Sequence, residues 1–180
     1  MKRWRLTLLL VAVIVGSACF FFQQRSNSFR LAFAGLPLKT SRTLKHADRF
    51  ILFSLEPYLE PHSKLADKSS RSPEKFHGFL ILGKTEITDK TERKQLLNDL
   101  FDCIPTGRPP WIAMCFNPRH GIRAIRNGEN VDLLICFECG RMYVFASKND
   151  SEYSSINFDR SKPSEFNRVL KAADVKLPDH

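Results

Sequence analysis

Short, mainly apolar stretches separated by polar turn residues run through the segment 111–146, and this pattern is typical of a meander of antiparallel strands. The first strand of this predicted meander covers residues 111–116, and the polar residues 117–121 connect it to the next strand. Two further strands are predicted earlier in the chain, near residues 50–56 and 76–82.

The second and third strands of the meander flank the dipeptide Asn127-Gly128. This pair favours a type I′ hairpin turn, because both central residues of that turn need positive φ. A turn centred there places Arg123 opposite Asp132 on one face of the hairpin, and apolar residues form a row on the other face.

Apolar residues at helical spacing predict two helices. The first begins after Asp89, where Asp89 and Glu92 resemble a capping box, and it stops at Pro105. The second lies within residues 161–180. The apolar faces of the two helices consist of Leu96, Leu97, Leu100, Phe101 and Ile104, and of Phe166, Val169, Leu170 and Ala173. The pattern therefore predicts an α+β domain in which an antiparallel sheet is packed by two helices.

The N-terminus has a different pattern. Lys2, Arg3 and Arg5 precede residues 6–22, which are apolar and carry no charge. At 1.5 Å per residue, a helix of that length reaches about 25 Å, slightly less than the roughly 30 Å hydrocarbon core of a bilayer. The basic flank favours a cytoplasmic N-terminus, so the rest of the chain is expected in the periplasm or at the cell exterior.

The mode of anchoring is open at this point. Small residues before Cys19 are compatible with a cleaved signal peptide or with lipidation of Cys19, but the apolar run continues beyond it, which favours an uncleaved anchor. We therefore expect a signal anchor over residues 1–22, a juxtamembrane linker over 23–48 and an extracytoplasmic domain over 49–180.

The chain has a formal net charge of +9, and its basic residues are dispersed among acidic ones. A nucleic-acid-binding surface would more often show a basic stripe with interleaved aromatic residues, so nucleic acid is not an expected partner. A basic surface beside an anchor suits contact with anionic lipid headgroups.

Candidate chemistry is concentrated in the spacing C-x4-H-x15-C-x2-C, formed by Cys115, His120, Cys136 and Cys139. Four nitrogen and sulfur ligands suit a tetrahedral zinc site, although a second C-x2-C pair would be a more specific signal. The hairpin register brings His120 near Cys136 but points the two side chains to opposite faces, unless the connection before the strand twists.

Three other interpretations stay open. Structural disulfides among Cys103, Cys115, Cys136 and Cys139 would fit an extracytoplasmic compartment. A bond between Cys136 and Cys139 alone would close a small ring, as in redox enzymes, but a strand follows this C-x2-C where a thioredoxin-like motif has a helix. Cys115 and His120 could form a nucleophile pair. Finally, the cysteines could be small buried hydrophobic residues.

The segments "CFNPRHGI", "VDLLICFEC" and "LGKTEITD" together resemble a group of small, uncharacterised bacterial proteins that carry C-F-x-P-R-H-x-I followed by I-C-F-x-C. The resemblance covers residues 76–145 and implies an exported or anchored bacterial protein without implying an activity. The residues in its distinctive segments are Cys115, Pro118, Arg119, His120, Cys136 and Cys139. The sequence thus favours a binding or structural module of the cell envelope, with a metal-dependent or thiol-based enzyme as the alternative.

Overall fold

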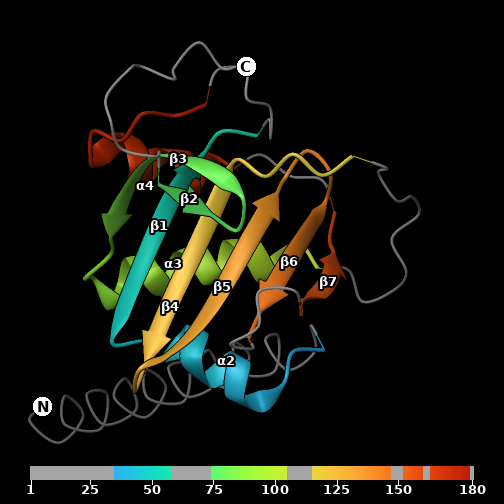
Figure 1. The fold of residues 1–180 in the computed structure, drawn as a ribbon. Helices are drawn as coiled ribbons and strands as arrows, with labels where there is room; N and C mark the ends of the chain where they lie inside the picture. The colour runs from blue at the N-terminus through green and yellow to red at the C-terminus, as the bar shows by residue number, and fades with distance from the viewer. Residues whose placement is uncertain (1–34, 58–73, 105–114, 147–151, 160–162, 179–180) are drawn as a thin grey trace, which may run out of the picture.

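The chain folds into an α+β domain built on one curled antiparallel sheet, as the computed structural model shows (Figure 1). The structure describes residues 35–57, 74–104, 115–146, 152–159 and 163–178. The elements in chain order are α2 (Leu38–Lys45), β1 (Arg49–Leu55), β2 (Lys75–Phe76), β3 (Phe79–Glu86), α3 (Lys90–Asp102), β4 (His120–Arg126), β5 (Glu129–Cys136), β6 (Arg141–Phe145), β7 (Ser154–Asn157) and α4 (Ser164–Ala172).

The predicted anchor over residues 1–22, with its apolar run 6–22 and Cys19, lies outside the described residues. Among the helices that the structure does describe, none combines the length and the apolar character that a membrane span requires.

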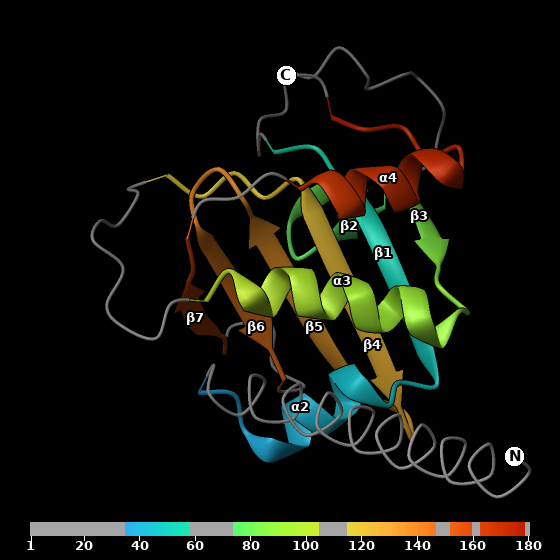
Figure 2. The same ribbon diagram turned by 180° about the vertical axis from the view of Figure 1, so that it is seen from behind.

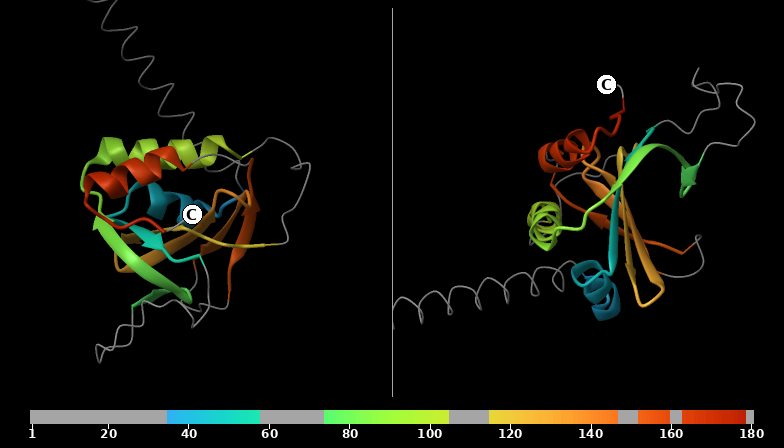
Figure 3. Two further views of the ribbon diagram at one scale, coloured as in Figure 1. Left: turned by 90° about the horizontal axis from the view of Figure 1, so that it is seen from above. Right: turned by 90° about the vertical axis from the view of Figure 1, so that its left-hand side faces the viewer.

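The seven strands lie in the order β2-β3-β1-β4-β5-β6-β7, and every neighbouring pair is antiparallel. Helices α3 and α4 both cover one face of this sheet (Figure 2). The β2–β3 hairpin curves away on the opposite side, as the side view in Figure 3 shows. The sheet therefore has a face packed by helices and an open face, which carries the hairpin.

The main hydrophobic core fills the space between the sheet and the helices. Leu52, Leu100, Leu133 and Leu170 come from β1, α3, β5 and α4, and each is fully buried. Burial of a leucine side chain contributes roughly 1.5–3 kcal/mol, so these contacts dominate the stability of the domain. A smaller apolar cluster lies on the open face and consists of Phe53, Leu55, Phe76, Phe79, Leu134 and Phe145.

The predicted β4–β5 hairpin is confirmed in detail. Asn127 and Gly128 have φ angles of 51° and 76°, so both occupy the left-handed region that a type I′ turn requires. Arg123 pairs with Asp132 in the predicted register. The Nε and Nη2 atoms of Arg123 donate to the two carboxylate oxygens of Asp132 over 2.9 and 2.6 Å.

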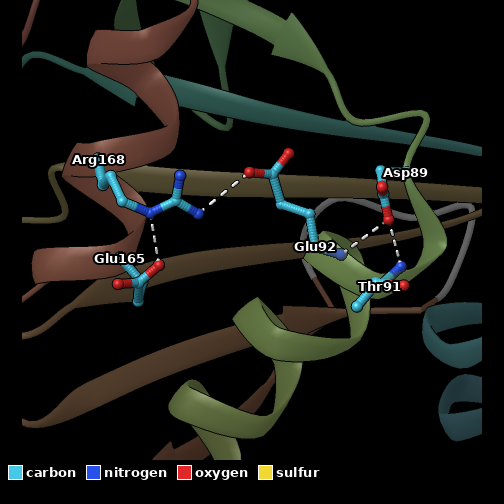
Figure 4. Close-up of polar contacts among 5 residues, drawn as sticks. All are labelled: Asp89, Thr91, Glu92, Glu165 and Arg168. Carbon is cyan, nitrogen blue, oxygen red and sulfur yellow. Dashed lines mark hydrogen bonds and ion pairs between the residues drawn. The ribbon is translucent and has the colours of Figure 1, made fainter.

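The first predicted helix is confirmed as α3, with Asp89 as its N-cap. Figure 4 shows Asp89 Oδ1 accepting hydrogen bonds from the backbone N–H groups of Thr91 and Glu92, over 2.5 and 3.1 Å. The side chain of Glu92 does not complete a capping box. Instead, its carboxylate accepts a hydrogen bond of 3.1 Å from Arg168 of α4, which also donates to Glu165 (Figure 4). This contact joins the two helices at the surface.

The prediction of one continuous strand over residues 76–82 was wrong. His77 and Gly78 have φ angles of 47° and 89° and form a tight turn, which divides this segment into the hairpin β2–β3. The physical reason is that glycine readily adopts positive φ, so Gly78 inside an apolar run marks a turn. The second predicted helix is α4, where Phe166, Val169 and Leu170 are buried as expected but Ala173 is the exposed C-cap.

Two further differences concern the ends of elements. Most of the first predicted meander strand lies outside the described residues, and β4 begins at His120, within the predicted connection. Helix α2 and the short strand β7 were not predicted. Leu36 and Leu44, from the segment that we expected to be a linker, are buried in the main core, so part of that segment packs as an integral piece of the domain.

Candidate functional site

Three cysteine sulfur atoms meet at the turn between β5 and β6. Cys136 is the last residue of β5 and Cys139 lies in the turn, and the two form a disulfide. Cys115, which precedes β4, places its Sγ atom 3.9 Å from the Sγ atom of Cys139. A free thiol is therefore in contact with one sulfur atom of an existing disulfide.

The local sequence explains why the C-x2-C segment turns back so tightly. Gly140 has a φ angle of 60°, a conformation that glycine adopts without strain, and its N–H donates to the carbonyl oxygen of Phe137 over 3.3 Å. The N–H of Cys139 donates to the Sγ atom of Cys136 over 3.1 Å. The turn therefore holds the two cysteines side by side and directs a backbone dipole at one sulfur atom.

The three cysteines differ sharply in exposure. Cys136 and Cys139 are 1% and 4% exposed, whereas Cys115 is an exposed residue with a free thiol. Because the disulfide is buried and the neighbouring thiol is not, an external reagent would meet Cys115 first.

His120 does not join this cluster. It lies opposite Ile135 in the β4–β5 register, and its ring extends into the core on the helical side, edge-on to Phe137 and Phe166 at centroid distances of 5.5 and 5.6 Å. Its Nε2 atom lies 2.8 Å from Oδ1 of Asn167 in α4. Successive residues of a strand point to opposite faces. Because His120 lies opposite Ile135, and Cys136 is the next residue of β5, His120 and Cys136 point to opposite faces of the sheet, as expected.

The buried position of His120 also determines its charge. Burial lowers its pKa to about 4, because the core disfavours the charged imidazolium; Arg119 adds to the effect, and the hydrogen bond to Asn167 only partly opposes it. The ring is therefore neutral at physiological pH. If Asn167 Oδ1 accepts, Nε2 carries the hydrogen, and the buried Nδ1 atom has no hydrogen-bond partner among the described residues.

The predicted zinc site is not assembled in this structure. Of its four residues, Cys115, Cys136 and Cys139 converge, but two of them are joined as a disulfide and His120 bonds to Asn167. No group of three or more His, Cys, Asp or Glu side chains suitable for a metal ion is found among the residues that the structure describes. Because the His120 ring lies in the core and bonds to Asn167, it also does not reach Cys115 to serve as the base of a nucleophile pair.

Of the disulfides considered among Cys103, Cys115, Cys136 and Cys139, the structure contains the Cys136–Cys139 bond. Cys136 and Cys139 are bonded, whereas Cys103 is half-buried and its Sγ atom donates to the carbonyl oxygen of Asp99 over 3.1 Å. The C-x2-C segment has a strand on each side, as the sequence predicted.

A second polar constellation lies on the open face, and sequence reasoning predicted its Arg123–Asp132 pair but missed its third member, His77. His77, at the β2–β3 turn, places Nε2 2.8 Å from Oδ2 of Asp132, whose carboxylate also holds Arg123. The His77 ring stacks on Phe145 at a centroid distance of 3.8 Å. Burial alone would raise the pKa of Asp132, but its hydrogen bonds and ion pairs with Arg123 and His77 outweigh that effect and lower the pKa.

This His77–Asp132–Arg123 triad borders a cavity of about 480 Å³ that reaches from the open face to α2. Thr40 and Thr43 of α2 also line it. The volume lies within the range of small-molecule pockets. The signal that could have located the triad was the His-Gly dipeptide, since a turn at that point folds His77 back over the sheet.

Searches of the chain against protein-family models, curated proteins and solved structures gave no match. The function is therefore argued from the geometry of the two sites alone.

Proposed function

We propose that the chain is a membrane-anchored thiol–disulfide exchange protein of the cell envelope. The observation that carries this proposal is the 3.9 Å contact between the Cys115 thiol and Cys139 Sγ, the latter being part of a disulfide. Exchange proceeds by attack of a thiolate on a disulfide sulfur atom, and this contact already brings the two reacting atoms to van der Waals distance.

The expected location supports the same chemistry. Disulfides persist in oxidising compartments such as the periplasm and the cell surface, and the basic flank before residues 6–22 predicts that the domain lies there. The anchor itself is part of the proposal, and it would keep the exchange site close to the membrane.

A purely structural role explains less of this geometry. Cys136 and Cys139 are separated by three positions, so their bond closes a very short loop, and short loops gain the least from cross-linking. A hairpin turn with its own hydrogen bonds also needs no such restraint. A staple, moreover, does not require the third sulfur atom of Cys115 in contact with it.

The test is a single-turnover exchange reaction with the full-length chain, purified in mild detergent without reductant. A synthetic peptide with two reduced cysteines serves as the thiol, and acid quenching followed by alkylation and mass analysis reports the state of every cysteine. We expect oxidation of the peptide to match the loss of the Cys136–Cys139 bond. The double variant Cys136→Ser/Cys139→Ser should be inert, and the matched control Cys103→Ser should react like the wild type. A wild-type disulfide that survives prolonged incubation with excess peptide would refute the function.

A second candidate function is the binding of a small molecule, and the cavity of about 480 Å³ beside the His77–Asp132–Arg123 triad favours it. A nuclear magnetic resonance screen with small carboxylic acids and amines would test this role. Ala146 is an exposed residue of the cavity lining, so Ala146→Trp should fill the cavity and abolish binding without disturbing the core. Fragments that bind the variant as well as the wild type would place the ligand elsewhere.

A further inference from the structure

Within the proposed exchange site, the buried disulfide and the exposed thiol beside it differ in their access to a substrate. Cys136 and Cys139 are almost completely covered, so a second protein cannot readily bring a thiolate in line with either sulfur atom. Cys115 is exposed and also touches Cys139. Building on the exchange function proposed above, we infer that Cys115 is the relay through which the buried disulfide oxidises external dithiols.

The geometry assigns a role to each sulfur atom. Cys139 is the target, because its Sγ atom is the one 3.9 Å from Cys115. Cys136 is the leaving group, because the N–H of Cys139 donates to its Sγ atom over 3.1 Å. A hydrogen bond to a developing thiolate favours the charged form, so this N–H stabilises Cys136 as the bond breaks.

The internal step conserves electrons. The Cys115 thiolate attacks Cys139 Sγ, a Cys115–Cys139 bond forms, the Cys136–Cys139 bond breaks, and Cys136 leaves as a thiolate that takes up a proton. The disulfide has thereby moved from a buried pair to a pair with one exposed member. No external oxidant or reductant is consumed in this step.

The external steps complete the transfer. A substrate thiolate attacks Cys115 Sγ, which forms a mixed disulfide and releases the Cys139 thiolate. The second thiolate of the substrate then attacks its own sulfur atom in the mixed disulfide and releases Cys115. The substrate dithiol has lost two electrons and two protons, and Cys136 and Cys139 have gained them as thiols. The substrate class is therefore a dithiol, because its second thiol releases Cys115 within the same molecule, whereas a monothiol would need a second molecule for that step.

The relay is tested by removing Cys115 alone from the full-length chain. In the single-turnover reaction with the two-cysteine peptide, Cys115→Ser should keep the Cys136–Cys139 disulfide but react on the order of 100-fold more slowly, because the pre-positioned nucleophile is lost. The matched control is Cys103→Ser, which replaces the other described cysteine outside the Cys136–Cys139 disulfide. It should react at the wild-type rate.

A second variant reports the internal step directly. Cys136→Ser leaves Cys115 and Cys139 as neighbouring thiols, so the protein purified without reductant should contain a Cys115–Cys139 disulfide in peptide mass maps. If Cys115→Ser alters folding, alkylation of Cys115 on folded Cys19→Ser/Cys103→Ser protein provides the same loss of the relay without a substitution at the site.

The outcomes separate the relay from the proposed function. Slow reaction of the Cys115 variant and a Cys115–Cys139 bond in Cys136→Ser support the relay. Wild-type rates after Cys115 is removed or alkylated overturn the relay and leave the exchange function standing. No reaction of the wild type with the dithiol overturns both.

Discussion

The Nε2 atom of His120 lies 2.8 Å from the Oδ1 atom of Asn167, and this hydrogen bond joins β4 to α4 inside the hydrophobic core. His120, a candidate zinc ligand and catalytic base by its place in the sequence, therefore has a structural role. Its imidazole is held neutral by burial, and Phe137 and Phe166 surround it edge-on.

We predict that this buried ring makes the stability of the domain depend on pH. The folded-state pKa of His120 is lowered to about 4 from an ordinary value of 6.5, so the unfolded chain binds more protons between these limits. The contribution is fully present above pH 6.5 and is lost as the pH falls to about 4. The total loss is about 3 kcal/mol, at 1.36 kcal/mol per pKa unit.

Urea unfolding from pH 7 to pH 4 measures this loss. The control is the double variant His120→Phe/Asn167→Leu, which removes both hydrogen-bonding partners together. It should show a smaller change in unfolding free energy over the same range. The remaining histidines, including His46 with its own lowered pKa, are common to both proteins. Equal slopes for the two proteins would contradict the assignment.

Gly121 is predicted to resist substitution because of close contact. A Cβ atom at this position would lie 2.7 Å from Cε1 of Phe76 and 2.9 Å from its Cδ1. We expect Gly121→Ala to destabilise the domain by about 1–3 kcal/mol, as overpacked cores do. The double variant Gly121→Ala/Phe76→Leu should recover part of the loss. Additive effects of the two changes in a thermodynamic cycle would rule out this contact as the cause.

Gly128 offers a contrasting case in which only the backbone matters. An added Cβ atom would meet nothing within 4 Å, but the φ angle is 76°. Gly128→Ala should therefore cost roughly 1–2 kcal/mol from conformation alone. Thermal unfolding of the variant checks the value, and no second-site substitution that enlarges the surrounding space should rescue it.

We predict that Asp132 contributes strongly to the stability of the open face of the sheet. Its side chain is 6% exposed and its carboxylate binds Arg123 and His77, so Asp132→Asn leaves a cation in a partly buried site without its counter-charge. We expect a loss of about 1–3 kcal/mol in urea unfolding, because the Arg123 side chain is 35% exposed and only partly desolvated. Glu129→Gln is the control, because its ion pair with Lys39 is exposed and should contribute at most about 1 kcal/mol. Similar losses of unfolding free energy for both variants would show that burial does not increase the contribution of Asp132 to stability.

Local patterns were sufficient to predict the parts of the fold that depend on neighbouring residues. The Asn127-Gly128 turn fixes the β4–β5 register, and the spacing of Leu96, Leu97 and Leu100 fixes the buried face of α3. The hairpin register also indicated that His120 and Cys136 point to opposite faces.

The tertiary relationships were not readable in the same way. The contact between Cys115 and Cys139 depends on how the chain before β4 approaches the β5–β6 turn, and no local pattern encodes that approach. His77 reaches Asp132 only because a turn replaces the expected straight strand. Helix α2 has few apolar residues, and its position depends on the single fully buried side chain of Leu44.

The strand order has a consequence for how the protein is made. β1 lies between β3 and β4, and Phe50 pairs with Ala124, which is synthesised much later. The centre of the sheet therefore has high contact order, and closing it requires a large loop to be ordered first. The β4–β5–β6 meander is local and can form early, whereas β1 must wait until β4 has been synthesised. A chain that folds during synthesis would thus complete its core only when nearly all of it has been made.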